Sequence, residues 1–163
     1  FTIWTLINIE KTAAGEELVT LKARQTAGAL PRLNYETIPA AGRVQVLDVL
    51  NKLTEDIYRA GPESVIDRTR EAVRIVLSVY LQDRDGVGSG LDLGKLISKL
   101  AADGEDERKS IVINASNIAR LLHARGKTAE QEIRSFRQIC EQDAEYAVQC
   151  MGTILCEFGW ASW

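Results

Sequence analysis

The sequence predicts an all-α fold, a single helical bundle of about five to seven helices with a short irregular or β segment at the N-terminus. Three observations predict it. Apolar residues recur at steps of three and four from residue 44 onward, as on the buried face of an amphipathic helix. Glycine or proline ends most of these stretches. A chain of 163 residues that is 45% hydrophobic and 26% charged can bury one substantial core.

The N-terminal part of the chain has the least regular pattern. In residues 1–9 apolar side chains occupy both odd-numbered and even-numbered positions, so the pattern fits a strand and a buried helix equally well. Residues 16–25 place acidic side chains first and basic ones later, as the helix dipole favours, and we expect a short helix there. Pro31 and Pro39 then bracket a connection, because proline disfavours helix at the residue before it.

These features predict two parts in the chain. Residues 1–39 form an N-terminal segment that we expect to be continuous with a region upstream of Phe1, and residues 40–163 form the helical bundle. The stretches that we expect to be helical carry the following apolar stripes: Val44, Leu47, Leu50, Leu53, Ile57 and Tyr58; Val65 to Leu81; Leu93, Leu96, Ile97 and Leu100; Ile111, Ala115, Ile118, Ala119 and Leu122; and Ile133 through Phe158. The second of these stretches becomes apolar on nearly all sides and is predicted to be the central helix.

The segment 82–90 is predicted to be a plain loop, because three glycines at alternate positions oppose both helix and packed strand. A phosphate-binding loop would follow a core strand and end in Lys-Ser/Thr. A calcium loop would need more oxygen ligands than Asp83 and Asp85 and a terminal glutamate. Asp92, just after the loop, is suited to be the N-cap of a short helix.

Charge and hydropathy limit the partners. Lys and Arg total 20 against 23 acidic residues, a formal charge of −3, so the whole chain has no net attraction for nucleic acid or anionic lipid, although local basic patches remain open. No stretch approaches the roughly 20 apolar residues of a membrane span. We therefore expect a cytoplasmic protein with no membrane partner.

The three cysteines, Cys140, Cys150 and Cys156, lie in one apolar stretch without a Cys-x-x-Cys pair. Free thiols fit this arrangement better than disulfides. Together with His123 they lack the paired ligand spacing of a zinc site, so we expect neither a metal nor a cofactor.

The candidate site lies where Asn117, Arg120 and His123 recur every third residue. This spacing places them on one side of the predicted helix, away from Ile118 and Leu122. His123 is the only histidine in the chain, and histidine is the side chain best suited to proton transfer near neutral pH. The polar residues that follow are candidates for substrate binding: Arg125, Lys127 and Gln131.

The order of these features resembles the HEPN superfamily. The resemblance covers roughly residues 40–158 and is carried by a long helix with Arg70-Glu71-Ala72, a glycine-rich loop, a short helix from Asp92 to Leu96, and a helix ending Arg120-Leu121-Leu122-His123. It implies a helical domain of a kind frequent in bacterial abortive-infection, toxin–antitoxin and other antiphage proteins. In active members an arginine precedes a histidine by five to seven positions, and two protomers bring these pairs together to cleave RNA.

The chain departs from that pattern, because Arg120 is only three positions before His123 and no arginine occupies 116–118. Either Asn117 replaces the arginine and the nuclease is inactive, or Arg120 and His123 form a variant site. Metal-independent RNA cleavage needs a base and a cation, which His123 with Arg120 or Arg125 could supply. A single histidine per chain would then require a homodimer.

The alternative interpretation needs no chemistry. A histidine near a helix C-terminus is often there because it interacts favourably with the helix dipole, and nearby basic side chains cap the last carbonyls. The chain would then be a non-catalytic protein–protein interaction domain of a larger protein. The sequence therefore predicts a HEPN-like domain of a bacterial defence or stress protein that acts in assembly or RNA binding, with ribonuclease activity left open.

Overall fold

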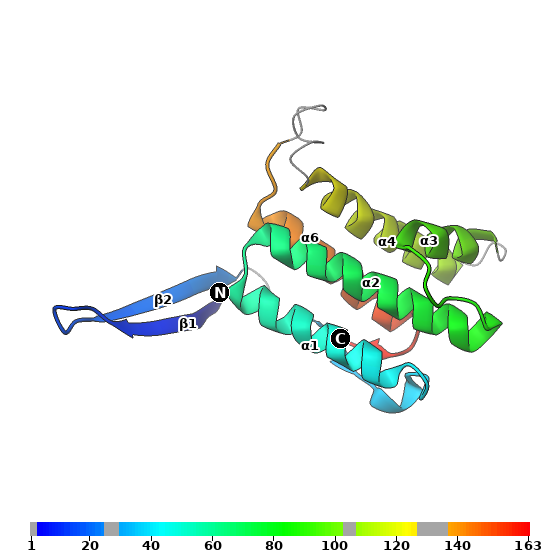
Figure 1. The fold of residues 1–163 in the computed structure, drawn as a ribbon, viewed down its shortest axis with the longest axis horizontal. Coiled ribbons are helices and arrows are strands. Elements are labelled where there is room, and N and C mark those ends of the chain that lie inside the picture. Colours follow the sequence, from blue (N-terminus) through cyan, green and yellow to red (C-terminus); the bar gives the residue numbers. More distant parts are fainter. Residues whose placement is uncertain (1–2, 25–29, 103–106, 127–136) are drawn as a thin grey trace.

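A computed structural model describes residues 3–24, 30–102, 107–126 and 137–163. Within these ranges five α-helices form a bundle, and two small antiparallel sheets accompany it (Figure 1). In chain order the elements are β1 (Ile3–Lys11), β2 (Glu17–Arg24), β3 (Arg32–Leu33), the 3-10 helix η1 (Tyr35–Thr37), α1 (Arg43–Arg59), α2 (Pro62–Asp85), α3 (Leu93–Ala102), α4 (Glu107–Arg125), α6 (Glu141–Glu157) and β4 (Ala161–Ser162). The predicted mainly helical fold with a short β segment is confirmed.

Helix α2 is the centre of the bundle. It contacts α1, α3, α4 and α6, and side chains in its middle, such as Val73 and Leu77, are completely buried. Pro62 occupies its first turn, where a missing N–H costs little, and Gly86 ends it in a left-handed conformation with φ of 68°. The prediction of a central helix is confirmed, although the helix continues to Asp85 through residues that the sequence assigned to the loop.

The buried faces of α1 and α4 differ from the predicted stripes within their first two turns. In α1 the core residues are Val46, Val49, Leu50, Leu53 and Ile57, whereas Val44 is 79% exposed. In α4 Val112 is buried and Ile111 is exposed. Both helices begin with neighbouring apolar residues that fit either of two faces, and packing against α2 selects one of them.

The last helix begins later than predicted. The sequence suggested one helix from about Ile133, but residues 137–140 are not helical and α6 begins at Glu141; residues 133–136 lie outside the described residues. The reason is a cap: the Asp143 carboxylate accepts a hydrogen bond from the backbone N–H of Cys140 at 3.1 Å. This hydrogen bond between the residue before the helix and a side chain in the first turn fixes the start of α6.

The N-terminal strands form a hairpin that extends away from the bundle near the end of α1 (Figure 1). Register runs from Ile3 opposite Arg24 to Lys11 opposite Glu17, with an irregularity between Leu6 and Asn8. The structure thus selects the strand for the first segment, which the sequence left open. The short helix predicted over 16–25 is wrong for 17–24, because pairing with β1 outweighs the weak preference that charge order gives a helix.

Residues 30–38 lie against the bundle, with Pro31 and Ile38 buried. Strand β3 pairs with β4 at the other end of the chain. Beside this small sheet the Tyr80 and Phe158 rings stack with centroids 3.9 Å apart, and Trp160 packs next to them. In the described part of the chain, no helix has the length and apolar character to cross a bilayer.

Candidate functional site

The end of α4 lies at the same end of the bundle as the starts of α2 and α6 (Figure 1). The helix ends where Gly126 donates hydrogen bonds to the carbonyls of Leu122 and His123, both at 3.2 Å. A β-carbon placed on Gly126 would lie 3.7 Å from Ile139 Cγ1, so the segment before α6 passes close by. Three helices therefore surround the region that holds the predicted site residues.

His123 faces α2 and remains partly exposed. Its position continues the buried face of α4 that contains Val112, Ser116 and Ala119, at steps of four, three and four. The side chain is 20% exposed, and its Nδ1 lies 3.1 Å from Oδ1 of Asp67 on α2. A carboxylate at this nitrogen fixes the orientation of the imidazole and stabilises its protonated form.

Asn117 and Arg120 lie together, as the spacing predicts. The Arg120 guanidinium donates to Asn117 Oδ1 at 3.4 Å, with Arg120 exposed and Asn117 half-buried. The expectation that all three residues share one outward side is only partly met, because His123 turns toward Asp67. The side chains of Arg120 and His123 both belong to the last turns of α4.

The residues predicted to bind substrate are placed only in part. Arg125 is half-buried in the last turn of α4, where a cation interacts favourably with the helix dipole. Lys127 and Gln131 lie outside the described residues. No test of their predicted role comes from the structure.

A strong ion pair lies beside this region. Arg137 donates to both Asp143 oxygens, at 2.7 and 2.6 Å, and this contact lowers the pKa of Asp143 to about 2. Cys140 belongs to the same cluster, since its sulfur lies 3.3 Å from the carboxylate. The pair helps to fix where α6 starts.

Asp67 is the residue that sequence reasoning missed. It sits on the polar side of α2 and is 67% exposed, so neither burial pattern nor a local motif marks it. Its meeting with His123 depends on how α2 and α4 are aligned, which the spacing of residues within one helix does not report. Within the described ranges, no group of three or more His, Cys, Asp or Glu residues is arranged to hold a metal ion.

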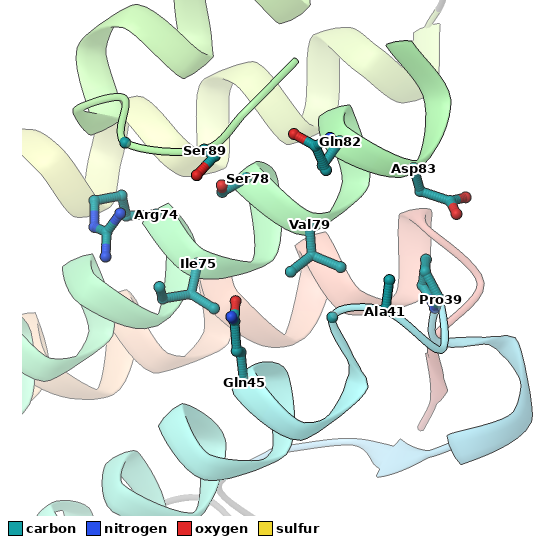
Figure 2. A pocket seen from close by; sticks show the side chains of 12 residues that line it. Pro39, Ala41, Gln45, Arg74, Ile75, Ser78, Val79, Gln82, Asp83 and Ser89 are labelled. Carbon is teal, nitrogen blue, oxygen red and sulfur yellow. The ribbon is translucent and has the colours of Figure 1, made fainter. Parts of the chain in front are cut away.

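A separate hollow lies farther along the bundle. A cavity of about 660 Å³ opens between the start of α1, the middle of α2 and the glycine-rich loop (Figure 2). Its polar lining includes Gln45, Ser78 and Gln82. Arg74 in the lining is held by Glu71 at 2.6 Å, which lowers the pKa of that carboxyl. Of the predicted site residues that the structure describes, none lines this cavity.

The glycines of the adjacent loop have structural explanations. A β-carbon on Gly88 would overlap the backbone oxygen of Ser78, and the Ser78 hydroxyl donates to the Gly88 carbonyl at 2.8 Å. Gly90 adopts φ of 74°, a conformation that favours glycine. The loop packs tightly on α2 without any need for a phosphate.

Comparison of the chain with protein-family models, with curated proteins and with solved structures found no match in any of the three.

Proposed function

We propose that this chain is a HEPN-like helical domain of a bacterial defence protein, and that it binds RNA at the end of α4 and cleaves it without a metal ion. The observation that carries the proposal is the contact between His123 Nδ1 and Asp67 at 3.1 Å. A carboxylate at Nδ1 holds the imidazole in the tautomer whose Nε2 can accept a proton. The order of helices on which the HEPN resemblance rests supports the same conclusion.

The reaction follows from the residues. His123, through Nε2, takes the proton of an RNA 2′-hydroxyl, and the 2′-oxygen attacks the adjacent phosphorus. The 5′-oxygen of the next nucleotide leaves with a proton from an acid, which yields a 2′,3′-cyclic phosphate and a 5′-hydroxyl. Asp67 stabilises the imidazolium that forms, so its role is to position and charge-balance His123.

Arg120 supplies the cation of the site. Its exposed guanidinium is available to a phosphate, and the hydrogen bond that it donates to Asn117 Oδ1 limits where it lies. A cation aimed at the phosphorane stabilises the charge that develops there. Arg125, in the last turn of α4, is a further candidate for contact with the RNA, as are Lys127 and Gln131 from the sequence alone, and the His123 of a second copy would act as the acid.

The test is a cleavage assay on a short end-labelled single-stranded RNA with excess EDTA, under single-turnover conditions. We expect His123→Ala to fall to the uncatalysed rate, and Arg120→Gln to lose about 100-fold, the usual effect of removing a charge-stabilising donor. Asp67→Asn should lower the rate about 10- to 100-fold and shift the acidic limb of the pH–rate profile.

Glu63→Gln is the matched control, since it removes one carboxylate from the preceding turn of α2 and should cleave like the unaltered chain. Equal rates for the unaltered chain and His123→Ala, or no cleavage by either, would contradict the catalytic proposal. Circular dichroism of each variant checks that the helices remain intact.

A second function is favoured by a separate observation. The hairpin β1–β2 exposes several large apolar side chains, among them Trp4 at 59% and Ile9 at 56%, and exposed apolar patches mark interaction sites. The chain would then act as a non-catalytic interaction domain. Fluorescence anisotropy with the same RNA separates the two: this second function predicts no binding, whereas the RNA proposal predicts binding that weakens in Arg120→Gln and with added salt.

A further inference from the structure

The two faces of the hairpin β1–β2 differ in character. Residues opposite each other in an antiparallel pair point to the same face, so the register assigns Leu6 with Leu21, and Ile9 with Val19, to one face. That apolar face also contains Trp4, next but one to Leu6 on the same strand, and ends at the hairpin tip with Lys11 opposite Glu17. The other face is mostly polar and carries Asn8, Glu10, Leu18 and Thr20.

The apolar face is not covered by the bundle. Its large side chains remain about half exposed, as follows: Trp4 59%, Leu6 54%, Ile9 56%, Val19 49% and Leu21 50%. A two-stranded hairpin is marginally stable in water by itself, and aligned apolar side chains of this size are rarely left in contact with solvent. A partner that covers this face would stabilise the hairpin as well as bury the side chains.

We infer that the apolar face of the hairpin is the contact surface for a second copy of this chain. A two-fold axis along the hairpin and between two such faces exchanges the positions of β1 and β2. Lys11 of one copy then lies against Glu17 of the other, Ile9 against Val19, and Leu6 against Leu21. Charge meets opposite charge and apolar side chains meet apolar ones, so the face is complementary to itself, as an isologous dimer requires.

The packing is face to face and not edge to edge. The irregular register between Leu6 and Asn8 interrupts the outer edge of β1, and such bulges prevent edge pairing. At the base of the hairpin, Leu6 and Ile7 border a recess of about 270 Å³ beside Tyr58 of α1, which leaves room for side chains of the second copy. The face presents one positive and one negative side chain at its tip, which gives no complement to a polyanion such as RNA.

The size of the face sets the expected affinity. A nine-residue strand at about 3.4 Å per residue is about 30 Å long, and two strands are about 10 Å wide. Each copy would therefore bury a few hundred Å², at or below the lower limit of specific interfaces. We expect association in the micromolar range, which sedimentation equilibrium from about 1 to about 200 µM covers.

The first experiment compares two substitutions on the same strand. Leu21→Asp places a charge in the apolar face, and Leu18→Asp places it on the opposite face, where Leu18 is equally exposed at 53%. We expect the unaltered chain and Leu18→Asp to dimerise with similar constants, and Leu21→Asp to remain monomeric over the same range. A monomeric unaltered chain, or equal behaviour of the two variants, would overturn the inference, with circular dichroism verifying that the bundle is folded in each.

A second experiment tests the orientation of the copies. Lys11→Glu alone and Glu17→Lys alone each bring like charges together across the two-fold axis, and each should dimerise about three- to tenfold more weakly, in line with exposed ion pairs. An equimolar mixture of the two restores both opposite-charge contacts in a heterodimer and should regain the original constant. Failure of the mixture to recover, while the unaltered chain dimerises, would contradict the proposed axis. The readout is the oligomeric state and needs no RNA, so failure of this dimer can be told apart from failure of RNA cleavage, although the proposed cleavage also uses a second copy.

Discussion

The ion pair between Arg137 and Asp143 gives the sharpest test of how the end of the bundle is built. Asp143 is the third residue of α6, and its carboxylate accepts hydrogen bonds from Arg137 and from the Cys140 backbone. Asp143→Asn retains the shape of the side chain and removes the charge. The variant should therefore lose the ion pair and weaken the cap while the rest of the core is unchanged.

The magnitude follows from the pKa. The contact with Arg137 lowers the pKa of Asp143 from 3.8 to about 2, which corresponds to about 2.4 kcal/mol at 1.36 kcal/mol per pKa unit. Arg137 is more than half exposed, and solvent screening weakens such pairs. We therefore expect Asp143→Asn to lower the free energy of unfolding by about 1–2 kcal/mol at pH 7.

The dependence on pH has a definite sign. The folded chain holds the Asp143 proton less tightly than the unfolded chain, so the carboxylate stabilises the fold fully above about pH 4. As the pH falls through the folded pKa of about 2, this contribution disappears. The difference between the unaltered chain and Asp143→Asn should thus be largest near pH 7 and shrink steadily below pH 4.

Urea denaturation followed by circular dichroism at pH 7, 4 and 3 measures that difference. Glu145→Gln, which removes one charge from the next part of the same helix, serves as the control and should change stability by less than about 0.5 kcal/mol. The reasoning is refuted if Asp143→Asn costs no more than this control at pH 7. It is also refuted if the difference is as large at pH 3 as at pH 7.

Two further predictions follow from the core. Gly42→Ala should lower the free energy of unfolding by about 1–3 kcal/mol, because the added β-carbon would lie 2.5 Å from a γ-carbon of Val79; Gly61→Ala, at the start of the next helix with nothing within 4 Å, should change stability little, and equal effects would contradict the packing. Burial raises the pKa of Cys150 to about 11, so its thiolate fraction near pH 8 is about 100-fold below that of an ordinary thiol. Iodoacetamide labelling read by mass spectrometry should modify Cys150 last of the three cysteines in native buffer and no more slowly than Cys140 in urea; prompt native labelling would contradict its burial.

Local signals predicted much of the bundle. Asp92 was expected to cap a short helix, and its carboxylate does accept a hydrogen bond from the Lys95 backbone N–H at 2.9 Å, one turn into α3. Gly159 follows the end of α6 with positive φ, as glycine after an apolar stretch suggests. Such helix ends are predictable because the capping residue or the terminating glycine lies within a few residues of the apolar stripe.

The wrong or incomplete predictions have a common cause: each depends on a contact between two separate elements. Residues 17–24 carry a charge order that suits a helix, yet they form β2 because β1 is available to pair with them. Likewise, the spacing of Asn117 and Arg120 correctly brought those two together, whereas the partner of His123 comes from α2. Neither the pairing of strands nor the alignment of two helices is contained in the periodicity of a single segment.

The pairing of β3 with β4 joins residues 32–33 to residues 161–162. The segment just before the bundle is therefore tied to the segment just after it. The hairpin β1–β2 takes no part in this pairing, so its removal would leave the connection intact. Loss of the final four residues would instead remove Trp160 and β4 together, and β3 would lose its partner strand. The hairpin is thus an appendage of the bundle, whereas the last four residues help to hold the bundle together.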